Sequence, residues 1–232
     1  MNARRGYVPG DERDFSPEAI GIMRKASRHV VYLINEGYDL KRSSTFVADH
    51  YLLSKRQRLA VVRSVATDDQ LKERENKRIP FNSLSRREIW VDGFNTIITL
   101  EVMLSRSILL FGMDGTIRDL AALRGTYRVI PETEKAARLL FDILNEAGVS
   151  KINILLDEPV SNSGRLKTLL AEVHEDYSMG LDIQIKRNVD KALYDKEYVV
   201  TSDSIILDNC ASWVNISEEC MKRMNMTGLK VW

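Results

Sequence analysis

The sequence has few of the features that mark exported or membrane-bound proteins. It contains two cysteines, Cys210 and Cys220, which form no Cys-x-x-Cys pair, so neither a disulfide framework nor a thiolate zinc site is predicted. Apolar runs such as 107–111 are far too short to span a bilayer. The basic N-terminus lacks the apolar stretch that a secretory signal needs. We therefore expect a soluble protein of the cytoplasm that does not interact with membranes.

Motifs for nucleotide-driven chemistry and for histidine-bound metals are also missing. The sequence has no Walker A loop and no Gly-x-Gly-x-x-Gly segment, so neither ATP-driven nor dinucleotide chemistry is indicated. The three histidines, His29, His50 and His174, are scattered without metal-ligand spacing, and we interpret them as structural.

The charge is distributed unevenly along a chain of otherwise ordinary globular composition. Hydrophobic residues make up 44% and charged residues 29% of the 232 residues, enough to build one or two domains with a buried core. Residues 1–88 hold 18 Lys and Arg against 12 Asp and Glu, a net of +6, whereas residues 89–232 hold 16 against 21, a net of −5. This division suggests that the first part attracts a polyanion and the second gathers carboxylates. Solvated faces that differ by chance remain an equal alternative.

The first third of the chain predicts helices. Residues 1–15 are expected to be a loose leader, and residues 67–87 a charged helix or linker that contains a domain boundary. Between them, apolar spacing and capping residues predict three helices: 17–36 after the cap Ser16, 41–49, and 55–66 after the cap Ser54.

We therefore predict a basic helical domain over residues 1–80, whose second and third helices have helix-turn-helix proportions. The third helix carries four cations that would contact a nucleic-acid backbone, or that simply face solvent: Lys55, Arg56, Arg58 and Arg63.

From Glu88 onward, short apolar segments alternate with amphipathic ones. Strands are expected at 89–91, 107–111, 151–156, 181–186, 198–200 and 213–216. Helices are expected at 132–147, from a cap at Ser161 or Ser163 to 176, after 203, and from 217. This alternation predicts an α/β domain over 88–232 with a mostly parallel sheet that helices cover on both faces. In such sheets ligands bind beyond the carboxyl ends of the strands.

Three of the predicted strands end in an aspartate: Asp92, Asp157 and Asp203, with Asn95 just beyond the first. Strand-end carboxylates from neighbouring strands lie close together and repel one another unless a cation is bound. Oxygen ligands suit Mg²⁺ or Mn²⁺. We predict that these four residues form a metal-binding catalytic site, and the alternative for each aspartate is a helix N-cap.

Residues 89–95, Ile-Trp-Val-Asp-Gly-Phe-Asn, resemble the first-strand motif of the NYN branch of PIN-like nucleases. Residues 199–203, Val-Val-Thr-Ser-Asp, are similar to a later strand of that superfamily. The resemblance spans about 88–216 and implies a Rossmann-like, PIN-like fold. It also implies Mg²⁺- or Mn²⁺-dependent cleavage of RNA or another single-stranded nucleic acid. Asp92 and Asp203 would be metal ligands, Asp157 the middle acid and Asn95 an orienting partner.

The sequence departs from that pattern at one position. NYN proteins usually have a second acid two residues after the late aspartate, where this chain has Ile205. Asp208 is the candidate replacement, although five residues along a helix correspond to a rotation of about 140°. The alternative function is therefore a non-catalytic nucleic-acid-binding protein with a degenerate PIN-like domain. A homodimer is compatible with either function.

Most of the chain also resembles a second family, the uncharacterised prokaryotic proteins catalogued as domain of unknown function 434. The resemblance is carried by the segments Gly-Tyr at 37–38, Asp-His-Tyr at 49–51 and Leu-Ser-Lys-Arg-Gln-Arg at 53–58. It implies no activity.

Residues 109–116, Leu-Leu-Phe-Gly-Met-Asp-Gly-Thr, are similar to the haloacid-dehalogenase phosphatase motif. That chemistry needs an aspartate nucleophile where this chain has Gly112, so a phosphatase is not favoured. Asp114, Arg118 and Asp119 would bind substrate phosphate or add a ligand, or else form a hairpin turn with an Arg–Asp pair. Glu101 would face the acidic centre, or be paired or solvated.

Overall fold

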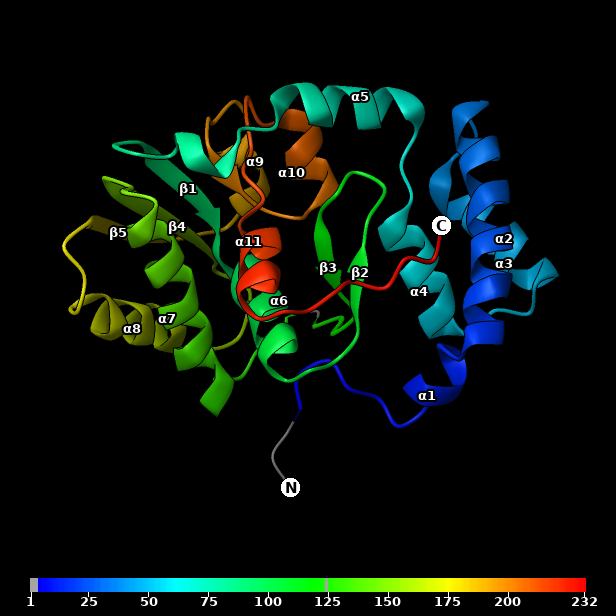
Figure 1. Ribbon diagram of the computed structural model, residues 1–232, viewed down its shortest axis with the longest axis horizontal. Coiled ribbons are helices and arrows are strands. Elements are labelled where there is room, and N and C mark those ends of the chain that lie inside the picture. Colours follow the sequence, from blue (N-terminus) through cyan, green and yellow to red (C-terminus); the bar gives the residue numbers. More distant parts are fainter. Residues whose placement is uncertain (1–3, 124) are drawn as a thin grey trace.

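The computed structural model describes residues 4–123 and 125–232, and a four-stranded parallel sheet lies at its centre (Figure 1). The strand order is β5-β4-β1-β6. The strands are β1 Glu88–Asp92, β4 Lys151–Asp157, β5 Gly180–Lys186 and β6 Val199–Val200. This confirms the predicted α/β fold. Because β1 pairs with both β4 and β6, the three strands that precede the predicted aspartates are direct neighbours.

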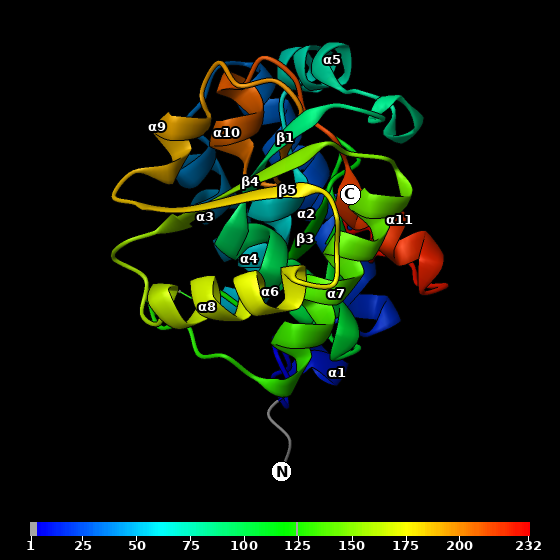
Figure 2. The ribbon, with the colours of Figure 1, turned by 90° about the vertical axis from the view of Figure 1, so that its left-hand side faces the viewer.

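Helices cover both faces of this sheet (Figure 2). On one face lie α6 Gly93–Leu104, α7 Pro131–Glu146 and α8 Ser163–His174; on the other lie the shorter α9 Val189–Leu193 and α10 Ser204–Asn209. Strand β4 shows why helices pack on both faces of the sheet, because it carries apolar side chains on each face. Its residues Ile152, Ile154 and Leu156 enter the core on the α6–α8 side, whereas Leu155 packs with the residues of α9 and α10. The last helix is α11 Ile216–Arg223.

Polar N-caps fix where four of the helices that precede the sheet begin. These helices are α2 Pro17–Asn35, α3 Leu40–His50, α4 Lys55–Ser64 and α5 Asp68–Lys77, capped by Ser16, Asp39, Ser54 and Thr67. Ser54 and Thr67 each form a capping box with a glutamine three residues later. The three helices predicted between residues 16 and 66 are confirmed. Residues 67–77 of the predicted charged helix or linker form a cap and a helix.

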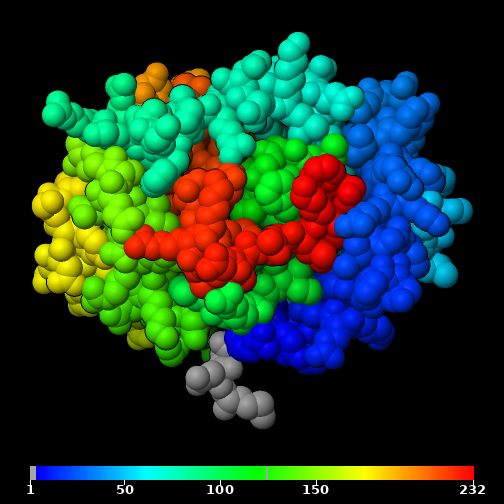
Figure 3. All heavy atoms as spheres, in the orientation of Figure 1, coloured from blue at the N-terminus to red at the C-terminus, as the bar shows by residue number. Residues whose placement is uncertain are grey.

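A two-stranded antiparallel hairpin lies between the N-terminal helices and the parallel sheet (Figure 1). Its strands are β2 Leu109–Phe111 and β3 Ile117–Asp119. Leu110 and Leu120 pack into the same core as residues of α2 and α4. The C-terminal segment crosses the surface from α11 to the N-terminal helices (Figure 3) and places Val231 in that core as well.

The structure corrects three local predictions. Residues 4–15 are not a loose leader: they contain α1 Asp11–Asp14, and Arg5 forms a buried ion pair with Glu101, Nε to Oε2 2.7 Å. The first three residues of that segment lie outside the described residues. Helix α8 is preceded by Asn162 in a left-handed conformation, so neither predicted serine is its N-cap.

The third correction concerns the strand predicted at 213–216. Trp213 makes only isolated bridges to Arg78 and Val199, and α11 begins at Ile216. The indole Nε1 of Trp213 donates to the carbonyl of Arg74, so tertiary contacts rather than a ladder hold this apolar segment. In the described residues, no helix combines the length and the apolarity needed to cross a bilayer.

Candidate functional site

Five aspartates line one depression of about 230 Å³ where the parallel strands end. Asn95 and Arg63 also line it, together with apolar side chains that include Phe94 and Ile98. The aspartates come from five different segments of the chain: Asp92, Asp119, Asp157, Asp190 and Asp203. The structure therefore brings together the three predicted strand-end aspartates with Asn95, and adds two further carboxyl groups.

Asp92 is the most buried of the strand-end carboxyls, with 4% of its surface exposed. It ends β1, and α6 begins directly after it at Gly93. A Cβ at Gly93 would lie 2.8 Å from the carbonyl oxygen of Leu155, so only glycine allows α6 to start this close to β4. The Asp92 carboxylate does not cap α6 and accepts a hydrogen bond from Thr201 instead, 2.8 Å.

Burial raises the pKa of Asp92 to about 7, although the hydrogen bond from Thr201 opposes the shift. The negative charges of Asp203, Asp157 and Asp190 add to the increase. The pKa of Asp157 is also raised, by burial and then by Asp190, and that of Asp190 by burial and then by Asp203. These four carboxyl groups therefore share one electrostatic environment in which complete ionisation is unfavourable.

Hydrogen bonds fix the segment that follows β6. The hydroxyl of Thr201 accepts from the backbone N–H of Asp203, 3.0 Å, and Ser202 Oγ donates to Asn95 Oδ1, 3.1 Å. Oδ1 of Asp203 accepts from the backbone N–H groups of Ile205 and Ile206, so this aspartate is the N-cap of α10. The N-cap alternative therefore applies to Asp203, but not to Asp92, nor to Asp157, since α8 starts after Asn162.

The opposite wall of the depression comes from the hairpin and from α4. Asp119 at the end of β3 accepts hydrogen bonds from Thr99 Oγ1, 3.1 Å, and from the backbone N–H of Ala121, 2.8 Å. Arg63 on α4 pairs with the Asp119 carboxylate, 3.4 Å, and remains partly exposed. Of the four basic residues predicted on this helix, Arg63 is the one that reaches the acidic site.

Asp190 was not predicted from the sequence. It lies in the first turn of α9, four residues after β5 ends at Lys186. The sequence did carry a signal for Asp190, because β5 too is followed by an acidic residue near the start of a helix. The interrupting Arg187-Asn188-Val189 segment conceals it.

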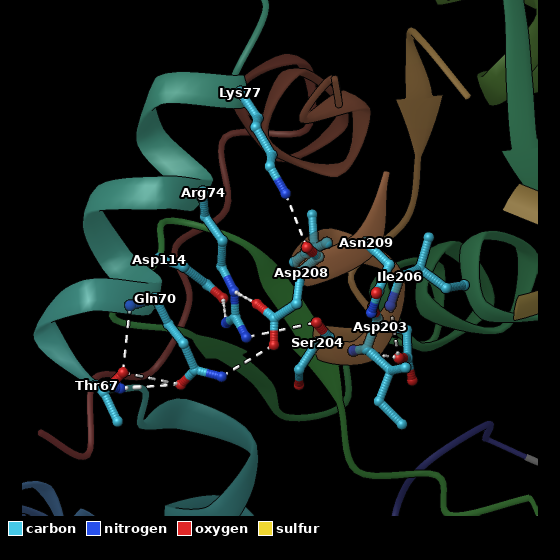
Figure 4. Close-up of polar contacts among 12 residues, drawn as sticks. Thr67, Gln70, Arg74, Lys77, Asp114, Asp203, Ser204, Ile206, Asp208 and Asn209 are labelled. Atoms are coloured by element: carbon cyan, nitrogen blue, oxygen red, sulfur yellow. Dashed lines mark hydrogen bonds and ion pairs between the residues drawn. The ribbon is translucent and has the colours of Figure 1, made fainter. Parts of the chain in front are cut away.

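Several predicted site residues lie elsewhere, in a buried ion network (Figure 4). Asp208 accepts from Arg74 Nε, 2.7 Å, and from Gln70 Nε2, 2.9 Å, so it faces α5 and does not line the depression. Asp114 pairs with Arg74 Nη1 and with Arg118 Nη2, both at 2.6 Å. Asp114 and Arg118 therefore form the predicted hairpin turn with an Arg–Asp pair, whereas Asp119 lines the acidic depression.

Gly112 shows why the phosphatase motif is only a local likeness. A Cβ at this position would lie 2.3 Å from Arg118 Nη1 and 2.7 Å from Asp114 Oδ1. The space that a nucleophilic side chain would need is therefore filled by the ion pair between Arg118 and Asp114.

The remaining predicted site residues lie outside the acidic depression. All three guanidinium nitrogens of Arg56 donate inside the protein, to Asp11 and to the carbonyls of Leu120 and Gly6. Arg58 pairs with Asp49, 2.7 Å, and Lys55 is exposed. Glu101 is fully buried and accepts hydrogen bonds from Arg5, Tyr127 and Thr133, so it is paired and does not face the acidic site.

The donors in the depression fit a hard divalent cation, because they are carboxylate and amide oxygens. Within residues 4–123 and 125–232, no group of three His, Cys, Asp or Glu side chains is arranged to hold a metal ion directly. Mg²⁺ commonly keeps several waters and takes only one or two protein carboxylates. A hydrated ion therefore suits this cluster better than a closed cage of protein ligands.

The fold and the site define an α/β protein in which a parallel sheet carries a cluster of carboxylates beyond its strand ends. The chain belongs to the family described as domain of unknown function DUF5616, whose model matches residues 81–219. The model of the protein of unknown function DUF434 matches residues 22–77, so the predicted resemblance to that family is confirmed over this N-terminal part of the chain.

An uncharacterised protein of Methanocaldococcus jannaschii is 34% identical over 185 residues, which cover 80% of this chain and 88% of the relative. No solved structure matches the chain. The descriptions of these relatives give no activity, so function has to be argued from the site.

Proposed function

We propose that this protein is a metal-dependent nuclease that cleaves RNA or another single-stranded nucleic acid with Mg²⁺ or Mn²⁺ as cofactor. The observation that carries the proposal is the convergence of Asp92, Asp157, Asp190 and Asp203 on one depression, where the pKa of Asp92 rises to about 7. Carboxyl groups that repel one another in a buried site destabilise the fold. A bound cation removes that cost, and it provides a reason for the cluster to exist.

A divalent ion bound here would supply an acidified water and neutralise charge on the leaving oxygen of a phosphodiester. Asp92, Asp157 and Asp203 would hold the hydrated ion, in part through its bound waters, and Thr201 keeps the Asp92 carboxylate in its orientation. Asn95, itself fixed by Ser202, would orient the attacking water or the substrate.

Arg63 provides the positive charge that a phosphodiester needs at the rim of an acidic site. Its guanidinium lines the depression, and among the residues that the structure describes it is held by the 3.4 Å contact with the Asp119 carboxylate and a bond to the Asp119 carbonyl. Electrostatic attraction between Arg63 and a substrate phosphate would offset the repulsion from the aspartates.

The resemblance to NYN nucleases supports the same activity. The family's usual acid is replaced by Ile205, which is exposed and does not line the depression. Asp190 and Asp119 bring additional carboxyl groups into the depression from other segments. The depression therefore contains five aspartates although residue 205 is not acidic.

A second candidate function is non-catalytic binding of nucleic acid. It is favoured by the capping role of Asp203, which commits one carboxylate oxygen to the backbone of α10, and by the isoleucine at 205. In this case the basic N-terminal helices would provide the affinity, and the acidic depression would have lost its catalytic role.

Cleavage assays distinguish the two functions. End-labelled single-stranded RNA and DNA should be cut by the wild-type protein with Mn²⁺ or Mg²⁺ and remain intact with EDTA. Asp92→Asn and Asp157→Asn should each reduce cleavage by orders of magnitude. Asp208→Asn is the matched control, because that carboxylate pairs with Arg74 outside the depression. Wild-type protein that binds both substrates but cuts neither with either metal would establish the binding function instead.

A further inference from the structure

A groove between α2 and α3 presents aromatic side chains to solvent. These two helices lie at the end of the molecule away from the parallel sheet (Figure 1). The groove has a volume of about 250 Å³. Two of its rings are unusually exposed for residues of their type, Phe46 at 72% and Tyr32 at 65%. Its walls are formed by His29, Tyr32, Leu33, Phe46, Val47 and His50.

Tyr51 holds the two imidazoles of this groove in place. Its hydroxyl is 3.2 Å from Nδ1 of His29, and its ring meets that of His50 edge to face with the centroids 4.9 Å apart. The contact with the Tyr51 hydroxyl therefore orients the imidazole of His29 before any ligand binds, which lowers the entropic cost of binding.

Positive charge adjoins the aromatic surface at Phe46. This ring also borders a second depression, of about 730 Å³, lined by Lys41, Arg42, Thr45 and Asp39. Neither Lys41 nor Arg42 forms an ion pair with any residue that the structure describes. The carboxylate of Asp39 is engaged as the N-cap of α3 and accepts from the backbone N–H of Arg42, 2.8 Å.

We propose that this surface binds a nucleotide unit of a single-stranded nucleic acid, with the base against Phe46 and Tyr32 and a phosphate at Lys41 and Arg42. Aromatic rings beside cations are the combination that single-stranded nucleic acids need, because bases stack and phosphates require positive charge. The choice of ligand rests on the proposed function. It places substrate contacts on the N-terminal helices, outside the acidic depression.

The charges favour this ligand over a second copy of the chain. An apolar protein partner seated on Phe46 would desolvate Lys41 and Arg42 and offer them no counter-charge. A phosphate next to a stacked base would supply that counter-charge.

The test is fluorescence anisotropy of a labelled single-stranded RNA of about 12 nucleotides, within the usual range of site sizes, in EDTA so that no cleavage occurs. Phe46→Ala should weaken binding about tenfold, the effect of losing one stacked base. Replacing both Lys41 and Arg42 by Ala should weaken binding and reduce the magnitude of the slope of log affinity against log salt by about 0.7, the value for one phosphate contact on a single strand. Leu52→Ala is the matched control, because Leu52 is apolar and 89% exposed but does not line the groove.

Hydrolysis of the small diester bis-para-nitrophenyl phosphate with Mn²⁺ separates this inference from the proposed function. Phe46→Ala should hydrolyse it at the wild-type rate, because no residue of the groove lines the acidic depression. Wild-type protein that binds RNA through Phe46 but leaves the diester intact would refute the nuclease and support the groove. Binding that is absent in the wild type, or equal in Phe46→Ala, would overturn the inference. The inference would also be overturned if the wild-type protein is a dimer and Phe46→Ala makes it a monomer without changing its RNA affinity. The groove would then hold a second copy of the chain.

Discussion

The hydroxyl of Thr201 donates to Oδ2 of Asp92 across 2.8 Å and accepts from the backbone N–H of Asp203 across 3.0 Å. One side chain therefore connects the end of β1 with the segment that follows β6. It sets the position of one metal-binding candidate relative to the other, and it is itself buried. Loss of this hydroxyl should disturb the geometry of the site before it disturbs the fold.

Replacing Thr201 with Val removes the hydroxyl while keeping the shape of the side chain. The pKa of Asp92 should rise further, because the Thr201 hydrogen bond opposes its increase. Affinity for Mn²⁺ should fall about tenfold, as is typical when a partner that orients a metal ligand is lost. Isothermal titration calorimetry measures this affinity. Thr201→Ser keeps the hydroxyl and should behave as the wild type. Equal affinities of the Val and Ser variants would contradict the orienting role.

The ionisation of Asp92 should make the metal-free protein less stable at higher pH. Its pKa in the folded state, about 7, lies above the ordinary value of 3.8, so the folded state holds its proton more tightly than the unfolded chain. The resulting stability is complete below the ordinary pKa and is lost as pH rises through 7. In EDTA, Asp92→Asn should therefore melt at a higher temperature than the wild type at about pH 8.

The difference in melting temperature should nearly vanish at about pH 4, where the wild-type carboxyl is protonated. Asp208→Asn serves as the control of opposite sign, because it removes a partner of the buried Arg74 and should lower the melting temperature. A pH-independent difference between Asp92→Asn and the wild type would contradict the raised pKa.

Arg63 should contribute to substrate affinity. Arg63→Ala should raise the KM for a single-stranded substrate and lower the salt dependence of binding by about 0.7, the value for one lost phosphate contact on a single strand. Arg58→Ala, on the same helix but paired with Asp49 outside the depression, should leave both quantities close to those of the wild type. If the two variants behave alike, Arg63 has no specific role.

The Asp114 network should contribute strongly to the free energy of unfolding. Burial alone would raise the pKa of Asp114, but the guanidinium groups of Arg118 and Arg74 hold it well below its usual range. Asp114→Asn leaves two buried guanidinium groups without their shared counter-charge and should destabilise the protein by about 3–5 kcal/mol. Urea denaturation at neutral pH measures this loss.

Comparison with an exposed pair tests the role of burial. Glu134→Gln, which breaks an exposed contact with Arg138 on α7, should change stability little. Because the folded pKa of Asp114 is depressed, its stabilisation should be present at neutral pH and fall as pH drops below 3.8. Similar losses in the two variants would argue against the network.

The sequence was most informative where local patterns determine the structure. The apolar segment at 151–156 predicted β4 because burial on both faces leaves no polar alternation, and Ser54 predicted the start of α4 because its side chain caps the helix. The strand-end aspartates followed from the geometry of parallel sheets. Asp190 was missed because three residues separate it from the end of β5, and α9, with five residues, is too short to show periodicity.

Tertiary partners could not be inferred from residue type. Arg56 looked like a phosphate ligand because it is a cation on a helix, yet its partner Asp11 lies 45 positions earlier in α1. Asp119 and Arg63 meet because the hairpin packs between α4 and the sheet, an arrangement for which the chain carries no periodic signal. Charge patterns identified candidate cations, but not whether each one was already paired.

The contact between Arg63 and Asp119 also has an evolutionary consequence. Arg63 lies in the segment that matches one family model and Asp119 in the segment that matches the other, so the depression has walls from both. Neither half of the gene encodes the complete site. Substitutions at positions 63 and 119 should covary among relatives, and lineages that separate the two segments should either lose the proposed nuclease activity or encode halves that reassociate.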